Sequence, residues 1–160
     1  MKLEKPRLYK EVFKHFSDER GYLNQLEIDK ILKLIDLKSF DPKLQLMSFS
    51  SAKNTFRGFH FQIEPFLQSK ILILHSGKIL DFIVPFKSPK EEKVQKYDMI
   101  AGDILFIPNT YAHGFLTRTS NVNIQYIIDN EFNQESYRGI NATNFIKKLM
   151  LKTKLIISER

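Results

Sequence analysis

The sequence predicts an all-β protein, a jelly-roll β-sandwich or barrel that carries one or two short helices. Three observations predict this fold. Short apolar segments recur along most of the 160 residues, and turn residues separate them at regular intervals. The chain also contains 14 Phe and 6 Tyr, an aromatic load that suits a β-rich core. Many short strands with regular turns are typical of closed sandwiches and barrels.

The first forty residues contain the expected helix. Residues 7–16 and 21–26 predict two strands around a polar turn at 17–21. In residues 27–37, apolar residues recur every three or four positions with charges opposite, which predicts an amphipathic helix. The Asp41-Pro42 pair ends this segment, because a residue before proline disfavours the helical conformation.

After residue 42 almost every segment predicts a strand. Several of these strands, such as Ile71–Leu74, are apolar on both faces and need cover on both sides, as in a double-sheet jelly roll or a dimer seam. The tail, 143–160, fits a helix or a strand. The length predicts a single domain over residues 1–160. The expected strands are 43–50, 55–63, 69–76, 78–86, 93–100, 103–108, 112–118 and 122–129.

Composition excludes several kinds of site. The absence of cysteine excludes disulfides, thiolate metal sites and a cysteine nucleophile. No stretch approaches the 18 apolar residues of a membrane span, and residues 1–10 do not form a signal peptide, so we expect a cytoplasmic protein without a membrane partner. The net charge of +7 favours anionic partners such as phosphorylated metabolites. The lysines are scattered without an aromatic-interleaved basic stripe, so we expect no nucleic-acid partner.

One strand places polar groups on a single face. In the segment 57–62 (Arg-Gly-Phe-His-Phe-Gln), strand alternation places His60 and Gln62 on the face that Gly58 leaves open, and Arg57 on the other face. His60 is the candidate base and Gln62 a candidate substrate contact. Lys70 follows eight residues after Gln62 and begins an apolar strand.

Two further residues complete the constellation. His113 lies in a strand–turn–strand segment, 107–115, and Tyr126 lies in a strand with apolar alternate positions, 124–128. Each residue alone is more often a packed or solvated side chain than a catalyst. Their combination and spacing indicate a site.

These residues resemble a known family. The segments 57–70 and 107–115 together with Tyr126 are similar to the dTDP-4-keto-6-deoxyglucose 3,5-epimerases, the cupins of the rhamnose pathway. The turn 18–22 (Asp-Glu-Arg-Gly-Tyr) matches that family's early Asp-x-Arg-Gly-aromatic turn, and 137–140 matches loosely. The resemblance covers about residues 12–140. It implies a cupin jelly roll, a homodimer, a nucleoside-diphosphate sugar as substrate, and a role in bacterial surface polysaccharide (capsule or O-antigen) biosynthesis.

The resemblance also implies roles for single residues. His60 matches the catalytic base, Lys70 the residue that stabilises the enolate oxygen, and Tyr126 the acid on the opposite face of the sugar. Arg57 and His113 match pocket residues around the sugar and the diphosphate.

Two more positions complete that set. Gln45 matches a position that lines the same site, and Arg20 matches a residue that reaches the nucleotide from the partner subunit.

Elementary chemistry agrees with these roles. Proton removal beside a ketone near neutral pH suits a histidine base, because the imidazole pKa lies near that pH. The developing oxyanion needs a fixed cation, and inversion needs an acid across the ring. No cofactor or metal is required. Metal cupins carry a second histidine two residues after the first, where this chain has Gln62, so we expect no metal site.

Two departures from the family pattern concern the site. The family orients its histidine base with an Asp that follows a C-terminal segment resembling 157–160, so here Glu159 and Asp81 remain as candidates for that carboxylate. The family also places an aromatic residue five positions after the catalytic tyrosine, where this chain has Glu131. A carboxylate can accept two hydrogen bonds from guanine but not from thymine, so Glu131 raises a GDP-linked 4-keto sugar, such as a heptose, as an alternative substrate.

Three other readings stay open. A C3-only epimerase needs only one inversion, whereas Tyr126 favours both. A 3,4-ketoisomerase of the same fold is disfavoured by Gln62. A non-catalytic sugar-nucleotide binding module would have no need of a base, a cation and an acid around one ring.

Overall fold

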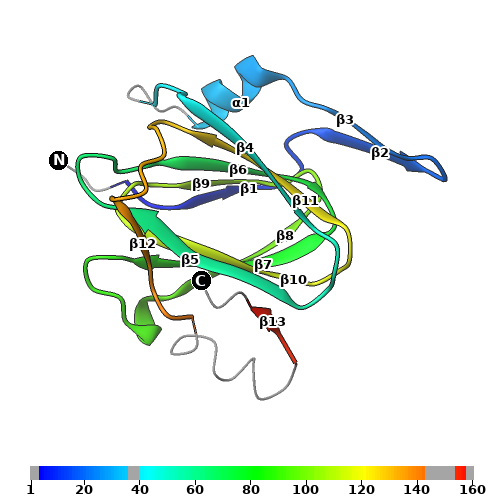
Figure 1. Ribbon diagram of the computed structural model, residues 1–160. Coiled ribbons are helices and arrows are strands. Elements are labelled where there is room, and N and C mark those ends of the chain that lie inside the picture. Colours follow the sequence, from blue (N-terminus) through cyan, green and yellow to red (C-terminus); the bar gives the residue numbers. More distant parts are fainter. Residues whose placement is uncertain (1–3, 36–39, 143–153, 158–160) are drawn as a thin grey trace.

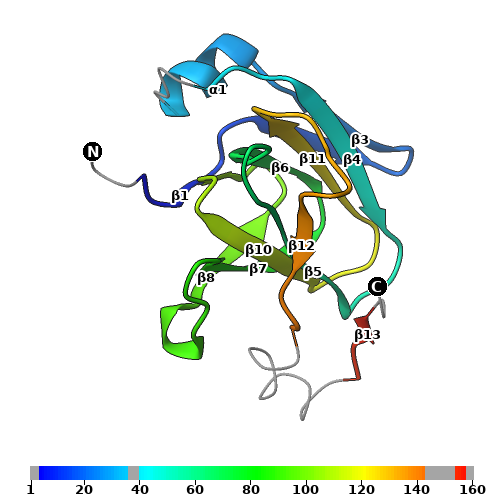
Figure 2. The same ribbon diagram turned by 60° about the vertical axis from the view of Figure 1, so that its left-hand side comes forward.

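Two antiparallel sheets pack face to face in this computed structural model, which describes residues 4–35, 40–142 and 154–157 (Figures 1 and 2). The first sheet has the strand order β1-β9-β6-β11-β4. Its strands are β1 (Arg7–Tyr9), β9 (Ile104–Ile107), β6 (Lys70–Ser76), β11 (Val122–Ile128) and β4 (Leu44–Ser50).

The second sheet has the order β12-β5-β10-β7-β8, and β13 pairs in parallel with β5. The non-consecutive order in both sheets is that of a jelly roll, which confirms the predicted all-β fold. Its strands are β12 (Tyr137–Gly139), β5 (Thr55–Gln62), β10 (Tyr111–Thr117), β7 (Lys78–Pro85), β8 (Gln95–Ile100) and β13 (Ile156–Ile157).

The main core fills the space between the sheets. Alternate residues of β6 and β11 point into it and meet residues of β7 and β10 from the opposite sheet, because neighbouring side chains of a strand point to opposite faces. The core includes Leu72, Leu74, Ile124, Ile83 and Phe115, all nearly inaccessible to solvent.

The outer face of the first sheet is also covered. The helix α1 (Ile28–Ile35) places the buried Ile31 against Ile71, Ile73 and Phe106. The strand Ile71–Leu74, predicted to need cover on both sides, therefore has it. A 3₁₀ turn at Glu91–Lys93 (η1) is the other helical element within the described part of the chain.

The predicted N-terminal strand is two strands in the structure. Residues 7–16 divide into β1 and β2 (Lys14–Asp18) because the chain bends at Glu11, which has a positive φ of 50°. The fully buried carboxylate of Asp103 holds this bend: it accepts a 2.7 Å hydrogen bond from Lys10 Nζ and a 3.0 Å bond from the Glu11 amide. The strand β12 is an addition that sequence patterns did not predict, whereas β13 lies in the tail 143–160, for which a helix or a strand was expected.

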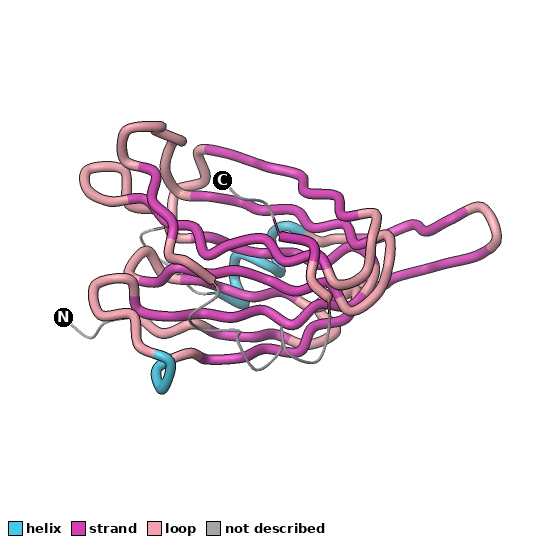
Figure 3. The backbone as a smooth tube through the Cα atoms, turned by 60° about the horizontal axis from the view of Figure 1, so that its bottom comes forward, coloured by secondary structure: helices cyan, strands magenta, loops and turns pink. Residues whose placement is uncertain are grey.

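A hairpin extends beyond the two sheets. Strands β2 and β3 (Gly21–Gln25) pair only with each other and form the arm seen in Figure 3. Its apolar side chains Phe16, Tyr22 and Leu23 are all exposed. Within the described residues, no helix has the length and apolar character that crossing a membrane requires.

Candidate active site

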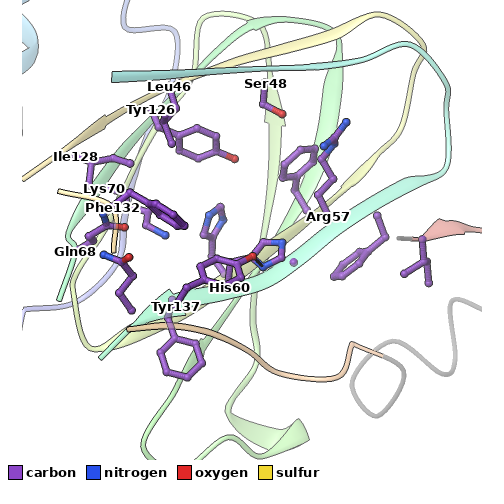
Figure 4. A pocket seen from close by; sticks show the side chains of 17 residues that line it. Leu46, Ser48, Arg57, His60, Gln68, Lys70, Tyr126, Ile128, Phe132 and Tyr137 are labelled. Atoms are coloured by element: carbon purple, nitrogen blue, oxygen red, sulfur yellow. Dashed lines mark hydrogen bonds between the residues drawn. The ribbon is translucent and has the colours of Figure 1, made fainter. Parts of the chain in front are cut away.

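A cavity of about 540 Å³ opens between the two sheets, at the end where β5, β6, β10 and β11 meet (Figure 4). The predicted base, cation and acid, His60, Lys70 and Tyr126, all line this one cavity. Its polar lining residues are Ser48, Arg57, His60, Gln62, Gln68, Lys70, His113, Tyr126 and Tyr137.

A bulge in β5 brings Arg57 and His60 into the same cavity. In the pairing with β10, His60 lies opposite His113 and Arg57 opposite Phe115, so β5 has one extra residue at this point. Simple alternation had placed Arg57 on the opposite face from His60, and that placement was wrong. A bulge inserts a residue and reverses the alternation beyond it.

Two glycines allow this bulge. Gly58 has a φ of 128°, and a Cβ built on it would lie 2.3 Å from the Cα of Gly114 and 2.8 Å from the His113 carbonyl oxygen. The two backbones approach so closely that no side chain fits at position 58. Glycine is the residue that tolerates both the positive φ and the close approach.

His60 is partly buried and lies near the cationic side chains of Lys70 and Arg57. Its Nδ1 atom forms a hydrogen bond with the hydroxyl of Tyr137. Burial, together with the nearby His113, Lys70 and Arg57, lowers the pKa of His60 to about 4. The imidazole is therefore neutral near pH 7 and able to accept a proton.

Lys70 brings an amine to the opposite wall of the cavity, at the start of β6. Burial lowers the pKa of Lys70, the charges of Asp81 and Asp129 partly offset this effect, and the resulting pKa is about 8. The amine still carries its proton at neutral pH. It can therefore act as a charged donor to an oxyanion in the cavity.

Asp81 supports His113 rather than His60. Its Oδ2 atom lies 3.3 Å from Nδ1 of His113, and both side chains are buried. Burial raises the pKa of Asp81 well above its ordinary value. Of the two candidate carboxylates for His60, Asp81 is therefore bonded to His113 instead, and Glu159 lies outside the described residues.

Tyr126 enters the cavity from β11, facing His113 with ring centroids 5.6 Å apart. Burial raises the pKa of Tyr126 well above its ordinary value, with a further contribution from Asp81. Its hydroxyl keeps its proton at neutral pH and can donate it.

Arg57 and Arg20 occupy very different places. Arg57 reaches the cavity, where its Nε donates to Ser50 Oγ over 3.1 Å. Arg20 lies at the tip of the β2–β3 hairpin, where it pairs with Asp18 over 2.5 Å, and its side chain is 84% exposed. Arg20 therefore does not contribute to the cavity of its own chain.

Gln45 does not line the cavity. In β4, Leu46 and Ser48 face inward and line the cavity, so Gln45 faces outward, where it accepts a 3.2 Å hydrogen bond from Gln125. The expectation for Gln45 was therefore wrong by one position of strand alternation.

Gln62 lies in the cavity wall but uses its amide within the protein. Its Nε2 donates to the carbonyl oxygens of Phe66 and Glu131, and its Oε1 accepts from the Asn133 amide over 2.7 Å. With these bonds Gln62 holds the loop 130–133 in place. Gln62 was expected to contact the substrate, but its amide instead forms these hydrogen bonds within the protein.

Phe132 takes the place expected for Glu131. The Glu131 side chain is exposed and is absent from the cavity lining, whereas the ring of Phe132 lines the cavity 5.7 Å from that of Tyr137. Sequence reasoning missed both aromatic residues as parts of the site. The Phe at 132 and the resemblance at 137–140 were the available signals.

The described part of the chain contains no set of side chains suited to bind a metal ion. No three His, Asp or Glu side chains there gather in a way that could hold an ion.

Comparisons with known proteins agree with this geometry. The family model described as dTDP-4-dehydrorhamnose 3,5-epimerase matches residues 6–160. The curated protein of that name from Escherichia coli K12 is 31% identical over 134 residues, which cover 78% of this chain and 69% of the relative. The one from Sinorhizobium fredii is 30% identical over 129 residues, covering 78% and 66%. The match thus spans about two thirds of these relatives' lengths.

Solved structures of the same name share the fold. The epimerase from Sulfolobus tokodaii is 29% identical with a TM-score of 0.66, covering 91% of this chain and 81% of that one. The one from Bacillus anthracis, with TDP and PPi bound, is 24% identical with a TM-score of 0.71, covering 96% and 89%.

Proposed function

The chain belongs to the dTDP-4-dehydrorhamnose 3,5-epimerase family, and from this premise we propose that it inverts C3 and C5 of a dTDP-linked 4-keto-6-deoxyhexose. The observation that carries the proposal is the convergence of His60, Lys70 and Tyr126 on one cavity. A neutral imidazole, a protonated amine and a protonated phenol are the three groups that the reaction needs.

The chemistry follows from these protonation states. His60 takes the proton from a carbon beside the ketone, and the bonding electrons of that C–H bond move onto the ketone oxygen as an enolate. The ammonium of Lys70 stabilises the enolate oxygen. The enolate then collapses to the ketone while the carbon takes a proton from the Tyr126 hydroxyl on the other face. Before the second inversion, His60 releases its proton to water and the Tyr126 phenolate takes one from water, so that both groups return to their starting states. The same steps at the second carbon then give the double inversion, and no step requires a metal or a redox cofactor.

A dTDP-linked sugar suits the cavity better than a GDP-linked one. The feature that suggested guanine was the carboxylate of Glu131, which does not line the cavity. The neighbouring Phe132 offers an aromatic face to a nucleobase instead, next to Tyr137. Arg57, exposed at the same cavity, is a suitable donor to the diphosphate.

We also propose that the enzyme is a homodimer in which Arg20 reaches the nucleotide of the partner subunit. Arg20 lies on the projecting hairpin and does not contribute to the cavity of its own chain. Exposed apolar side chains lie along the hairpin and on the outer face of β4: Phe16, Leu23, Met47 and Phe49. Burying such side chains stabilises association.

The wider setting is a proposal of the same kind. We propose one domain over residues 1–160, because the family model matches nearly all of it. A dTDP-linked 4-keto sugar fits a rhamnose-type pathway. Such a pathway would supply surface polysaccharide synthesis, and we propose that this enzyme works in the cytoplasm.

A panel of dTDP- and GDP-linked 4-keto sugars, incubated with the enzyme and followed by NMR, tests the substrate class. We expect turnover of the dTDP-linked hexose. Turnover of GDP-linked sugars alone would contradict this assignment, and inversion at C3 alone would identify a C3-only epimerase.

A further inference from the structure

The partner of the His60 ring determines which of its nitrogens can act as a base. Strand β12 pairs with β5, with Tyr137 opposite Gln62 and Gly139 opposite His60. This register places the phenol of Tyr137 beside the imidazole, with ring centroids 5.4 Å apart and ring planes 26° apart. The hydroxyl and Nδ1 form a hydrogen bond, drawn in Figure 4.

The direction of this hydrogen bond has a chemical consequence. A neutral imidazole carries one hydrogen, on Nδ1 or on Nε2. If the Tyr137 hydroxyl donated to Nδ1, Nε2 would carry the hydrogen and could accept no proton. If the phenolic oxygen accepts from Nδ1–H, Nε2 keeps its lone pair.

We propose that Tyr137 is a positioning residue whose phenolic oxygen accepts the Nδ1–H hydrogen of His60 and so leaves Nε2 as the base. This inference rests on the proposed function, in which His60 removes the proton. When Nε2 takes the substrate proton, the imidazolium retains its Nδ1–H bond to Tyr137. The ring therefore keeps one orientation through the proton transfer.

The carboxylates near the cavity are engaged elsewhere. Asp81 forms a hydrogen bond with His113, and Asp129 accepts a 2.7 Å hydrogen bond from the Ser69 amide. Within the described residues, the hydrogen-bond partner of the His60 ring is thus a neutral phenol. A phenol orients the ring without adding the negative charge that would strengthen the base.

Within the described residues, the groups that lower the pKa of His60 come from three strands. Arg57 of β5, His113 of β10 and Lys70 of β6 all lower the pKa of His60, and Tyr137 and Tyr126 bring neutral hydroxyls. Loss of the Tyr137 oxygen would remove a group that stabilises the imidazolium. The pKa of His60 would therefore fall further in a Tyr137→Phe variant.

The test measures the tautomer directly. Nitrogen-15 NMR of the whole protein with labelled histidine distinguishes a protonated from an unprotonated ring nitrogen, and the His60→Asn spectrum identifies the His60 signals. In the wild type we expect hydrogen on Nδ1 and a bare Nε2. In Tyr137→Phe we expect a shift toward the Nε2–H form, whereas the control Tyr97→Phe, which loses a hydroxyl bonded to Gln95, should match the wild type.

Activity provides the second readout. We expect Tyr137→Phe to lower kcat by about 10- to 100-fold, the usual effect of losing a partner that orients a reacting group. The acid limb of its kcat–pH profile should move to lower pH, which loss of packing alone would not cause.

The outcomes separate the two proposals. An Nε2–H tautomer in the wild type overturns the inference even if Tyr137→Phe does not fold. An unchanged tautomer and an unchanged acid limb in a folded Tyr137→Phe overturn it as well. The Nδ1–H tautomer in a wild type that does not epimerise any 4-keto sugar would support the role of Tyr137 as acceptor while overturning the proposed function.

Discussion

His60 and His113 lie opposite each other on β5 and β10, and each ring takes its Nδ1 partner from a different strand. Tyr137 of β12 binds His60, and Asp81 of β7 binds His113. Burial lowers the pKa of both imidazoles, to about 4 for His60 and well below the ordinary value for His113. Near pH 7 the positive charge of the cavity therefore resides on Lys70 and Arg57.

The first prediction concerns the pH dependence of kcat/KM. His60 must be unprotonated to act as a base, so activity should rise with pH through its pKa of about 4. Lys70 must be protonated to stabilise the enolate, so activity should fall as pH rises through about 8. The expected profile is a bell with a plateau between these values. A single limb centred near pH 6.5 would contradict this assignment.

The second prediction concerns the cation. Lys70→Met should reduce kcat by about 10²- to 10³-fold, the range seen when one oxyanion donor is removed. The measurement is steady-state turnover of the dTDP-linked 4-keto sugar. Lys78→Met is a matched control, because Lys78 is exposed at the start of β7 and does not line the cavity. Equal effects of the two substitutions would show that Lys70 has no special role.

The third prediction concerns the bulge. Gly58→Ala should destabilise the fold by more than about 3 kcal/mol, because its Cβ would collide with backbone atoms and its φ is positive. Gly21→Ala isolates the second effect, since Gly21 has a φ of 132° with nothing within 4 Å of its Cβ. It should cost only about 1–2 kcal/mol. Urea unfolding compares the two, and similar losses would refute the steric argument.

The fold was predictable because its signals are local. Strand and turn patterns after residue 42 placed the strands β4 to β11 close to their observed positions. The division of residues 7–16 into two strands could not be predicted, because it depends on Asp103, which lies about ninety residues away in the sequence. The strand β12 was too short to stand out from its loop.

The site was predictable in its residue types but less so in its geometry. Alternation assigned Arg57 to the wrong face because the bulge at Gly58 depends on the close approach of Gly114. Gln45 missed the cavity by one position of β4. The hydrogen-bond partner of His60 is Tyr137, which the β12–β5 register brings beside it. No sequence pattern encodes this long-range pairing.

The fourth prediction concerns the nucleobase. By isothermal titration, dTDP should bind at least about tenfold more tightly than GDP, and Phe132→Ala should weaken dTDP binding by about tenfold or more, the effect of losing one stacked base. Affinity for inorganic pyrophosphate is the control and should not change. Tighter binding of GDP would restore the alternative based on Glu131.

The fifth prediction tests the shared site of the proposed dimer. Arg20→Ala and His60→Asn chains should each be poorly active alone. Mixed after unfolding and refolding together, they should regain about a quarter of wild-type activity, because a mixed dimer holds one site with both residues intact. Absence of recovery in verified mixed dimers would place Arg20 outside the partner's site.

The central claim, that His60 removes a carbon-bound proton beside a 4-keto group, is tested most directly by deuterium exchange. The enzyme is incubated with dTDP-4-keto-6-deoxyglucose in deuterated water and the sugar is followed by NMR. We expect deuterium at C3 and C5, and a loss of about 10²- to 10⁴-fold in the exchange rate for His60→Asn. No exchange with the wild type, or an equal rate with His60→Asn, would contradict the account.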